Sequence, residues 1–235
     1  MSIFLSVDPL AEQFPNWNPY HYVHNNPINL VDPTGMSAEW IPGTDDKAIS
    51  YSRNEKGEVT WSSNTSDKMK EVGNAMLKTV KGTEQLNKAI NSKDVRVDVV
   101  VNEGRHEGES GPYGNVTYGI TRPIDVEYDS NGIPQKITSA KINLYPKAYE
   151  EVVNFISANP KSKNAFDTAY DGHIINAANY SIMENTSTTF GHEIEHVFDP
   201  VSSSYLNNVN NRSNNSEENP NKISRQIYQQ LDSQR

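Results

Sequence analysis

The chain has 235 residues, with 30 acidic and 21 basic side chains that give a formal net charge of −9. This balance argues against a nucleic-acid-binding surface, which needs basic patches. Only 34% of the residues are hydrophobic, and no stretch is long and apolar enough to span a bilayer. Cysteine is absent, which excludes disulfides and cysteine catalysis, so a transition metal would need histidine or carboxylate ligands.

The first 36 residues differ in composition from the rest of the chain. They hold five of the 13 prolines and five aromatic residues, and proline at this density interrupts helices and restricts strands to sheet edges. Residues 25–27 and 32–35 predict turns. The first ten residues lack a basic start and a sustained apolar core, so we expect no secretory signal. So short a segment cannot bury its aromatic side chains alone, and we expect it to belong to something larger.

The rest of the chain predicts an α+β domain over residues 66–235, preceded by a polar linker or loose hairpin at 37–65. Apolar spacing and β-branched runs decide the elements. Helices are expected at 68–80 (capped by Ser66 and Asp67), 84–90, 149–158 and 222–231. Strands are expected at 95–101, 116–120, 124–128 and 136–144, with a turn at 129–132 and an asparagine-rich loop at 206–221.

The segment Gly191-His192-Glu193-Ile194-Glu195-His196 contains the pattern His-Glu-x-x-His. Residues four apart share one face of a helix, so both imidazoles can reach one ion while the glutamate lies beside them. Zinc lowers the pKa of a water molecule, and the glutamate can take its proton as general base. The three hydroxyl residues at 187–189 are N-cap candidates, and the Asp-Pro pair at 199–200 should end this helix.

Chance does not readily explain the motif. Six histidines and 17 glutamates in 235 residues give an expected number of such patterns of roughly 0.01. The alternative is an exposed acidic helix with two incidental histidines. Phe190, Ile194 and Val197 follow helical spacing and should bury the opposite face, which favours an ordered helix. We therefore expect a zinc site that contains His192 and His196, with Glu193 as the catalytic residue.

This helix resembles the active-site helix of zincin metallopeptidases, which implies a zincin-like fold for the domain. A metzincin-type ligand is disfavoured because Ser202 stands six residues after His196. The gluzincin pattern takes a glutamate from a later helix, and Glu217 and Glu218 lie 21 and 22 residues on. The segment from Ser216 resembles one that closes the site in metallopeptidase toxins. The resemblance implies Glu217 as third ligand, with Glu218 as the alternative.

For the other candidate residues, the sequence indicates a functional role less strongly. Asp199 is either a hydrogen-bond acceptor for a ligand histidine or the end of the helix. His106 and His173 are expected in a loop and at a turn or strand end. Arg225 and Tyr228 are candidates for stabilising an oxyanion, although surface or packing roles fit them better.

A second resemblance covers nearly all of residues 3–36. It rests on SVDPLAE at 6–12, WNPYHYV at 17–23 and NNPINLVDPTGM at 25–36. These runs resemble the end of the RHS-repeat-associated core. In that family the core closes a large β-shell, and an Asp-Pro-x-Gly element marks its end, commonly with self-cleavage. A variable C-terminal toxin follows, which implies that residues 37 onward are the toxin and that His21 and His24 are structural.

Together these features predict a zinc metallopeptidase that acts as the C-terminal toxin of an RHS-type bacterial polymorphic toxin. The resemblance implies a protein or peptide substrate, a cognate immunity protein and delivery into a target cell by a specialised secretion system, with the toxin cytoplasmic in the producer before export. Two alternatives stay open. One is a catalytically inactive RHS-derived binding or carrier fragment, and the other is a zinc amidase that acts on the cell wall.

Overall fold

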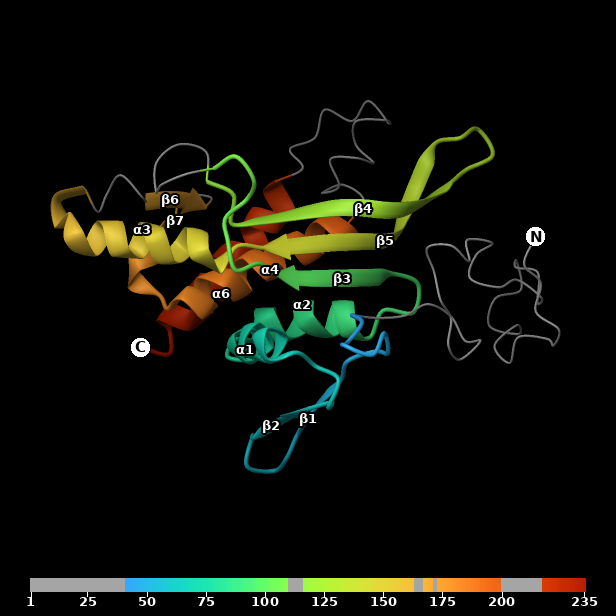
Figure 1. Cartoon of the computed structure of the whole chain (residues 1–235), viewed down its shortest axis with the longest axis horizontal. Helices are drawn as coiled ribbons and strands as arrows, with labels where there is room; N and C mark the ends of the chain where they lie inside the picture. Colours follow the sequence, from blue (N-terminus) through green and yellow to red (C-terminus); the bar gives the residue numbers. More distant parts are fainter. Residues whose placement is uncertain (1–40, 110–115, 163–166, 171–172, 200–216) are drawn as a thin grey trace.

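The computed structural model describes residues 41–109, 116–162, 167–170, 173–199 and 217–235. They form a mixed α+β structure, as expected (Figure 1). The predicted RHS remnant at 1–36 and residues 206–216 of the predicted loop lie outside the described residues. No helix among the described residues is both long and apolar enough to cross a membrane.

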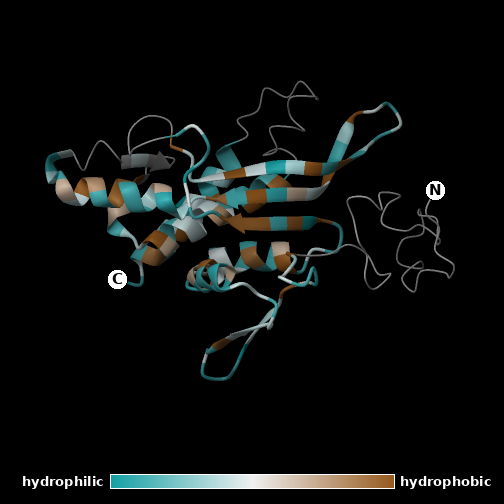
Figure 2. Cartoon of the chain, in the orientation of Figure 1, coloured by the Kyte–Doolittle hydropathy of each residue, from teal (hydrophilic) through white to brown (hydrophobic). Residues whose placement is uncertain are grey.

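The central element is a three-stranded sheet in the order β3-β5-β4. β3 (Arg96–Val101) is parallel to β5 (Pro134–Leu144), whereas β4 (Gly119–Tyr128) is antiparallel to β5 and forms the edge. In Figure 2, β3 is predominantly hydrophobic. Val97, Ala140 and Ile142 on β3 and β5 are fully buried, which places the core against these two strands.

The structure joins two strands that the sequence separated. We expected strands at 116–120 and 124–128, divided by Pro123, but β4 is one continuous strand. An edge strand tolerates proline because the missing N–H can face away from the neighbouring strand. The register of β4 against β5 shifts between Pro123 and Asp125, which accommodates the irregularity. The turn at 129–132 forms as predicted, with Gly132 at φ 76°.

The first two helices lie under the sheet in Figure 1. The boundary between them differs from the predicted one. α1 (Asp67–Met76) begins at the predicted cap, where Ser66 accepts a hydrogen bond from the backbone of Met69. α2 (Val80–Ile90) begins at Thr79, whose hydroxyl accepts from the backbone of Gly82. Val80 therefore starts α2 and is 68% exposed, so the expectation that the first helix continues to residue 80 was wrong.

The remaining helices surround α4 (Ile182–Phe198), which contacts α1, α2, α3, α6 and the sheet strands β4 and β5. α3 (Pro146–Ala158) starts three residues before the predicted helix because proline suits a first helical position. A short hairpin of β6 (Asp167–Tyr170) and β7 (His173–Asn176), followed by η4 (Ala177–Asn179), leads into α4.

α6 (Glu218–Asp232) is longer than the predicted helix at 222–231. Residues 218–221, expected in the loop, form its first turn. Pro220 lies in that turn, where a proline does not remove an intrahelical hydrogen bond. Ile223, Ile227 and Leu231 then bury one face of α6 in a small cluster with Tyr180 and Ile175.

The segment at 41–65 is part of the packed domain. It contains a hairpin of β1 (Tyr51–Arg53) and β2 (Val59–Trp61). A loose hairpin was one of the two predictions for residues 37–65. Ile41 and Ile49 are almost completely buried in the same cluster as Met69 and Val72 of α1. A boundary at residue 66 would therefore divide this cluster, and the described residues 41–65 contain the hairpin alternative and pack against α1.

Candidate metal centre

α4 is the scaffold of the site. Ser181 accepts a hydrogen bond from the backbone of Glu184, and the Glu184 carboxylate accepts one from the backbone of Ser181. This reciprocal capping box starts the helix six residues before the nearest N-cap candidate that the sequence suggested. Phe190, Ile194 and Val197 are buried as predicted, so the helix is fixed on its opposite face.

His192 and His196 lie one turn apart on α4, and their imidazoles face one point. Their Nε2 atoms are 3.1 Å apart. The side chains are 17% and 14% exposed, so the rings are shielded from solvent while their edges remain accessible. The helical spacing of the motif therefore brings the two nitrogens together, as the sequence predicted.

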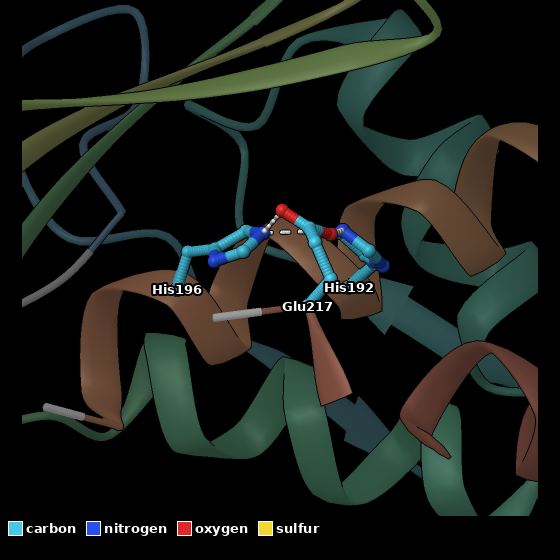
Figure 3. Close-up of side chains that lie close together, drawn as sticks. All are labelled: His192, His196 and Glu217. Carbon is cyan, nitrogen blue, oxygen red and sulfur yellow. Dashed lines mark hydrogen bonds and ion pairs between the residues drawn. The ribbon is translucent and has the colours of Figure 1, made fainter. Parts of the chain in front are cut away.

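Glu217 supplies a carboxylate to the same point, immediately before α6. One of its oxygens lies 3.1 Å from His192 Nε2, and the other lies 3.5 Å from His196 Nε2. Figure 3 shows the three side chains pointing toward one another from these two segments. Hydrogen bonds from His192 and His196 hold the pKa of Glu217 well below its usual range, so its carboxylate is ionised.

Close packing of α6 on α4 brings Glu217 to the histidines. Gly191 permits this approach, because a Cβ there would lie 2.8 Å from Ile227 Cδ1 and 3.4 Å from Ile223 Cγ2. Asn219 also donates a hydrogen bond of 2.7 Å to the carboxylate of Asp199, at the end of α4. The contact fastens the first turn of α6 to the helix that carries both histidines.

Glu193 lies on the side of α4 that faces the edge strand. It is 6% exposed, and the hydroxyl of Thr121 donates a hydrogen bond of 2.8 Å to its carboxylate. Gly119 allows β4 to come this close, since a Cβ there would lie 3.0 Å from the Glu193 carboxylate and 2.5 Å from the Thr189 methyl group. The edge strand thus fixes the orientation of the glutamate.

A cleft of about 300 Å³ opens beside His192 and Glu193. Its walls come from the residues that lead into β4 and from α3, α4 and α6, and include Tyr118, Tyr149 and Ser224. Ser224 is buried on α6, with its hydroxyl 3.4 Å from His192 Nδ1. These wall residues have no signature in the sequence, because they meet only through packing.

The structure separates the remaining candidates from this centre. Glu218 is exposed as the first residue of α6. Asp199 caps the end of α4 and accepts the bond from Asn219, so it acts here as a link between helices. The Tyr228 hydroxyl donates to Asn185 in the core, which fits packing. His106 lies in a loop against the ring of Tyr145.

The donor set fits a zinc ion. Two donors bound at 2.0–2.2 Å to one tetrahedral ion stand roughly 3.3–3.5 Å apart. The two imidazole Nε2 atoms are 3.1 Å apart, one oxygen of Glu217 lies 3.1 Å from His192 and its other oxygen lies 3.5 Å from His196. With one ligand atom taken from each residue, the three atoms lie within 4.8 Å of one another. Two imidazoles and one carboxylate are also a common protein ligand set for a catalytic zinc, which leaves a fourth position open. Glu217 is 51% exposed, so the centre is open to solvent on that side.

Arg225 lies on α6 and is half-buried. His173 begins β7, at the end of a strand as expected. Comparisons of this chain with protein-family models, with curated proteins and with solved structures found no match. The assignment of a function therefore depends on the sequence motifs and on the geometry of the site.

Proposed function

We propose that this protein is a zinc-dependent metallopeptidase with a zincin-like domain. His192, His196 and Glu217 would hold the metal, and Glu193 would act as general base. The observation that carries the proposal is the convergence of these three donor groups within 3.5 Å of one another, beside the cleft that Glu193 also lines. Incidental histidines on an exposed helix would not meet a carboxylate from a segment 21 residues further along the chain.

In the proposed reaction, Glu193 and Thr121 have different roles. Bound zinc supplies Lewis-acid chemistry, in that it lowers the pKa of a water molecule and polarises a carbonyl oxygen. Glu193 takes the proton of the attacking water and delivers it to the amide nitrogen that leaves. The hydrogen bond from Thr121 holds one oxygen of this carboxylate, so it is oriented before the substrate arrives. Burial against β4 limits competing water around Glu193.

The position of β4 supports an extended peptide as the substrate. β4 is the edge of its sheet, so its outer side presents backbone N–H and C=O groups. An extended peptide can pair with such an edge. Gly119 of β4 lines the cleft beside Glu193, and a peptide along the strand would therefore pass the catalytic groups.

The biological setting is proposed from the sequence alone. Because residues 3–36 resemble the end of an RHS-associated core, we propose that the metallopeptidase is the C-terminal toxin of such a protein. Delivery into a target cell and neutralisation by an immunity protein in the producer belong to the same proposal.

The test compares wild type with Glu193→Gln and Glu195→Gln. Glu195 lies on the same helix but pairs with Lys88 at 2.8 Å, so its substitution is a matched control. Glutamine at 193 keeps the size of the side chain but cannot accept a proton. We expect about one zinc per chain in all three proteins, by metal analysis. Hydrolysis of a quenched-fluorescence peptide library should fall by roughly 10²-fold or more only in Glu193→Gln.

Toxicity on expression inside a sensitive cell should fall with it. If Glu193→Gln cleaves and kills as efficiently as wild type, the protein does not work by a glutamate-activated water. If that variant loses its zinc while Glu195→Gln keeps it, Glu193 is a ligand or a structural residue, and its role has been assigned wrongly.

A further inference from the structure

The residues that lead into β4 form one wall of the cleft beside the candidate metal centre. Val116, Thr117 and Tyr118 line it together with Gly119, the first residue of the strand. From Gly119 onward, pairing with β5 holds the strand, beginning with Gly119 opposite Leu144. The three residues before it lie outside the strand, so other contacts must hold them in place.

Alternation along the chain decides which contacts these residues can make. The backbone N–H of Tyr145 donates to the carbonyl of Tyr118 at 2.9 Å, so the polar backbone groups of Tyr118 face β5. Beside an antiparallel neighbour, successive residues turn these groups alternately toward that strand and away from it. Those of Thr117 and Gly119 therefore face the open side of the sheet, where a peptide substrate would pair. Pro123, which has no N–H, belongs to the same outward series.

Glu109 takes the place of a neighbouring strand at Thr117. Its two carboxylate oxygens lie 3.1 and 3.0 Å from the backbone nitrogen of Thr117, and the Thr117 hydroxyl donates to one of them. The Glu109 side chain is 16% exposed. Burial disfavours its charge, but the bonds from Thr117, with His106 and Arg105 nearby, outweigh this effect and lower the pKa of Glu109. The carboxylate is therefore ionised at neutral pH.

Arg105 fastens Glu109 to α3. Its guanidinium lies 3.5 Å from Glu109 and 2.9 Å from Glu151 of α3, and its side chain is only 9% exposed. The ring of His106, in the same loop, packs edge-on against the ring of Tyr145, the N-cap of α3. The loop after β3 is thus attached to a helix of the domain, and through Glu109 it holds the residues that lead into β4.

We propose that Glu109 is a positioning residue for substrate binding, because it fixes the start of the edge strand at Thr117 before a peptide pairs with the strand from Gly119 onward. The inference rests on the proposed function and deepens it. Glu109 itself belongs neither to the lining of the cleft nor to the cluster of metal donors. Its effect on a substrate is therefore exerted through the backbone of Thr117.

This role separates substrate binding from the chemical step. Thr121, which donates to Glu193, lies further along β4 in the part that is paired with β5. Loss of Glu109 leaves that pairing in place, so the orientation of Glu193 should not change. A variant without Glu109 should bind peptides less tightly and convert the bound peptide at the normal rate.

The test compares zinc-loaded wild type with Glu109→Ala, Glu109→Gln and Glu107→Ala, using the peptide of the quenched-fluorescence library that wild type cleaves fastest. Glu109→Ala should raise KM roughly tenfold, as expected when hydrogen bonds to a charged group are lost, and leave kcat within about twofold. Glu109→Gln keeps one acceptor for the Thr117 N–H, so its KM should rise only about threefold. Glu107 is exposed in the same loop and is the matched control, which should behave as wild type.

Hydrogen exchange of the backbone amides measures the contact without turnover. In Glu109→Ala the amide of Thr117 should exchange at least about fivefold faster than in wild type, because its acceptor is gone. The amides of β4 that face β5 should keep their rates. Every variant should retain about one zinc per chain, as measured by metal analysis.

The outcomes distinguish this role from the proposed function. An unchanged KM in Glu109→Ala, an equal rise in Glu107→Ala, or a fall in kcat with loss of zinc overturns the role of Glu109. Unchanged exchange at Thr117 overturns the contact on which it depends. If Glu109→Ala does not fold, a wild-type KM in Glu109→Gln overturns the role instead. If wild type cleaves no peptide, the proposed function fails and the role in substrate binding fails with it, whatever the exchange rates show about the contact.

Discussion

Glu217 and Glu218 are adjacent in the sequence but differ in environment. Both are exposed, but Glu217, just before the first turn of α6, reaches both histidines of the motif, whereas Glu218 is not in the cluster that they form. Sequence spacing could not choose between them with certainty, because both lie just over 20 residues after His196. The contact of Asn219 with Asp199 fixes the start of α6 and thereby places Glu217 beside the centre.

Matched substitutions at Glu217 and Glu218 should therefore differ in their effect on zinc binding. Glu217→Gln and His196→Ala should each weaken zinc binding by more than the roughly 10- to 100-fold typical for the loss of a supporting residue, because each removes a direct ligand. Glu218→Gln should bind zinc as wild type does. Competition with a chelator measures the affinity. Full zinc retention by His196→Ala would overturn the site, and equal effects at 217 and 218 would overturn the choice of third ligand.

At the scale of elements, α4 carries both histidines on one face and Glu193 on the adjacent side, toward β4. The helix has 17 residues and starts with a capping box at Ser181, whereas His196 lies in its last turn. A terminal turn frays more readily than the interior of a helix. The hydrogen bond from Asn219 of α6 to Asp199 is therefore important for the site, since it holds the end of α4 that carries His196.

The capping box at the other end of α4 gives a test of what stabilises the helix as a whole. Ser181→Ala removes the acceptor for the backbone of Glu184 and should lower the free energy of unfolding by about 1 kcal/mol. Ser181→Asp restores a side-chain acceptor and should keep the stability of wild type. Chemical denaturation of the three proteins measures the difference. An equal loss in the Asp variant would show that the hydroxyl acts through some other contact than the cap.

At the scale of the molecule, the core extends beyond the domain that the sequence outlined. Ile41 and Ile49 pack with α1, the sheet and α4 in one cluster. The same cluster contains Phe190 and Ile194, on the opposite face of α4 from the histidines. The residues at 41–65 thus stabilise the helix that bears the site, although they contribute no group to it.

Two truncated chains distinguish the packed region from the rest. A chain that begins at Ser37 should keep its zinc and its toxicity, because the RHS-like segment supplies no catalytic group. A chain that begins at Ser66 loses two buried isoleucines and should be less stable by roughly 3 kcal/mol or more, with the usual burial value for each side chain. Thermal unfolding and metal analysis measure both effects. Loss of zinc by a folded chain from Ser37 would move the boundary toward the N-terminus.

The sequence by itself determined the features that depend on local spacing. Three features are properties of neighbouring residues and could therefore be predicted: the i, i+4 pattern of His192 and His196, the apolar spacing of Phe190, Ile194 and Val197, and the β-branched run of β3. The α+β class followed from the same patterns. The predicted starts of the helices were less accurate than their positions. α4 begins at a capping box at Ser181, and α6 begins with a turn that contains a proline, so both helices start before their first apolar residues.

Only the tertiary structure decided which distant residues meet. The selection of Glu217, the hydrogen bond from Thr121 to Glu193 and the stacked wall of Tyr118 and Tyr149 all join segments far apart in the chain. None has a local signature, because each arises from the packing of α6, β4 or α3 on α4. Gly119 and Gly191 permit two of these approaches, and the close contacts that a Cβ would make at each are visible only in the tertiary structure.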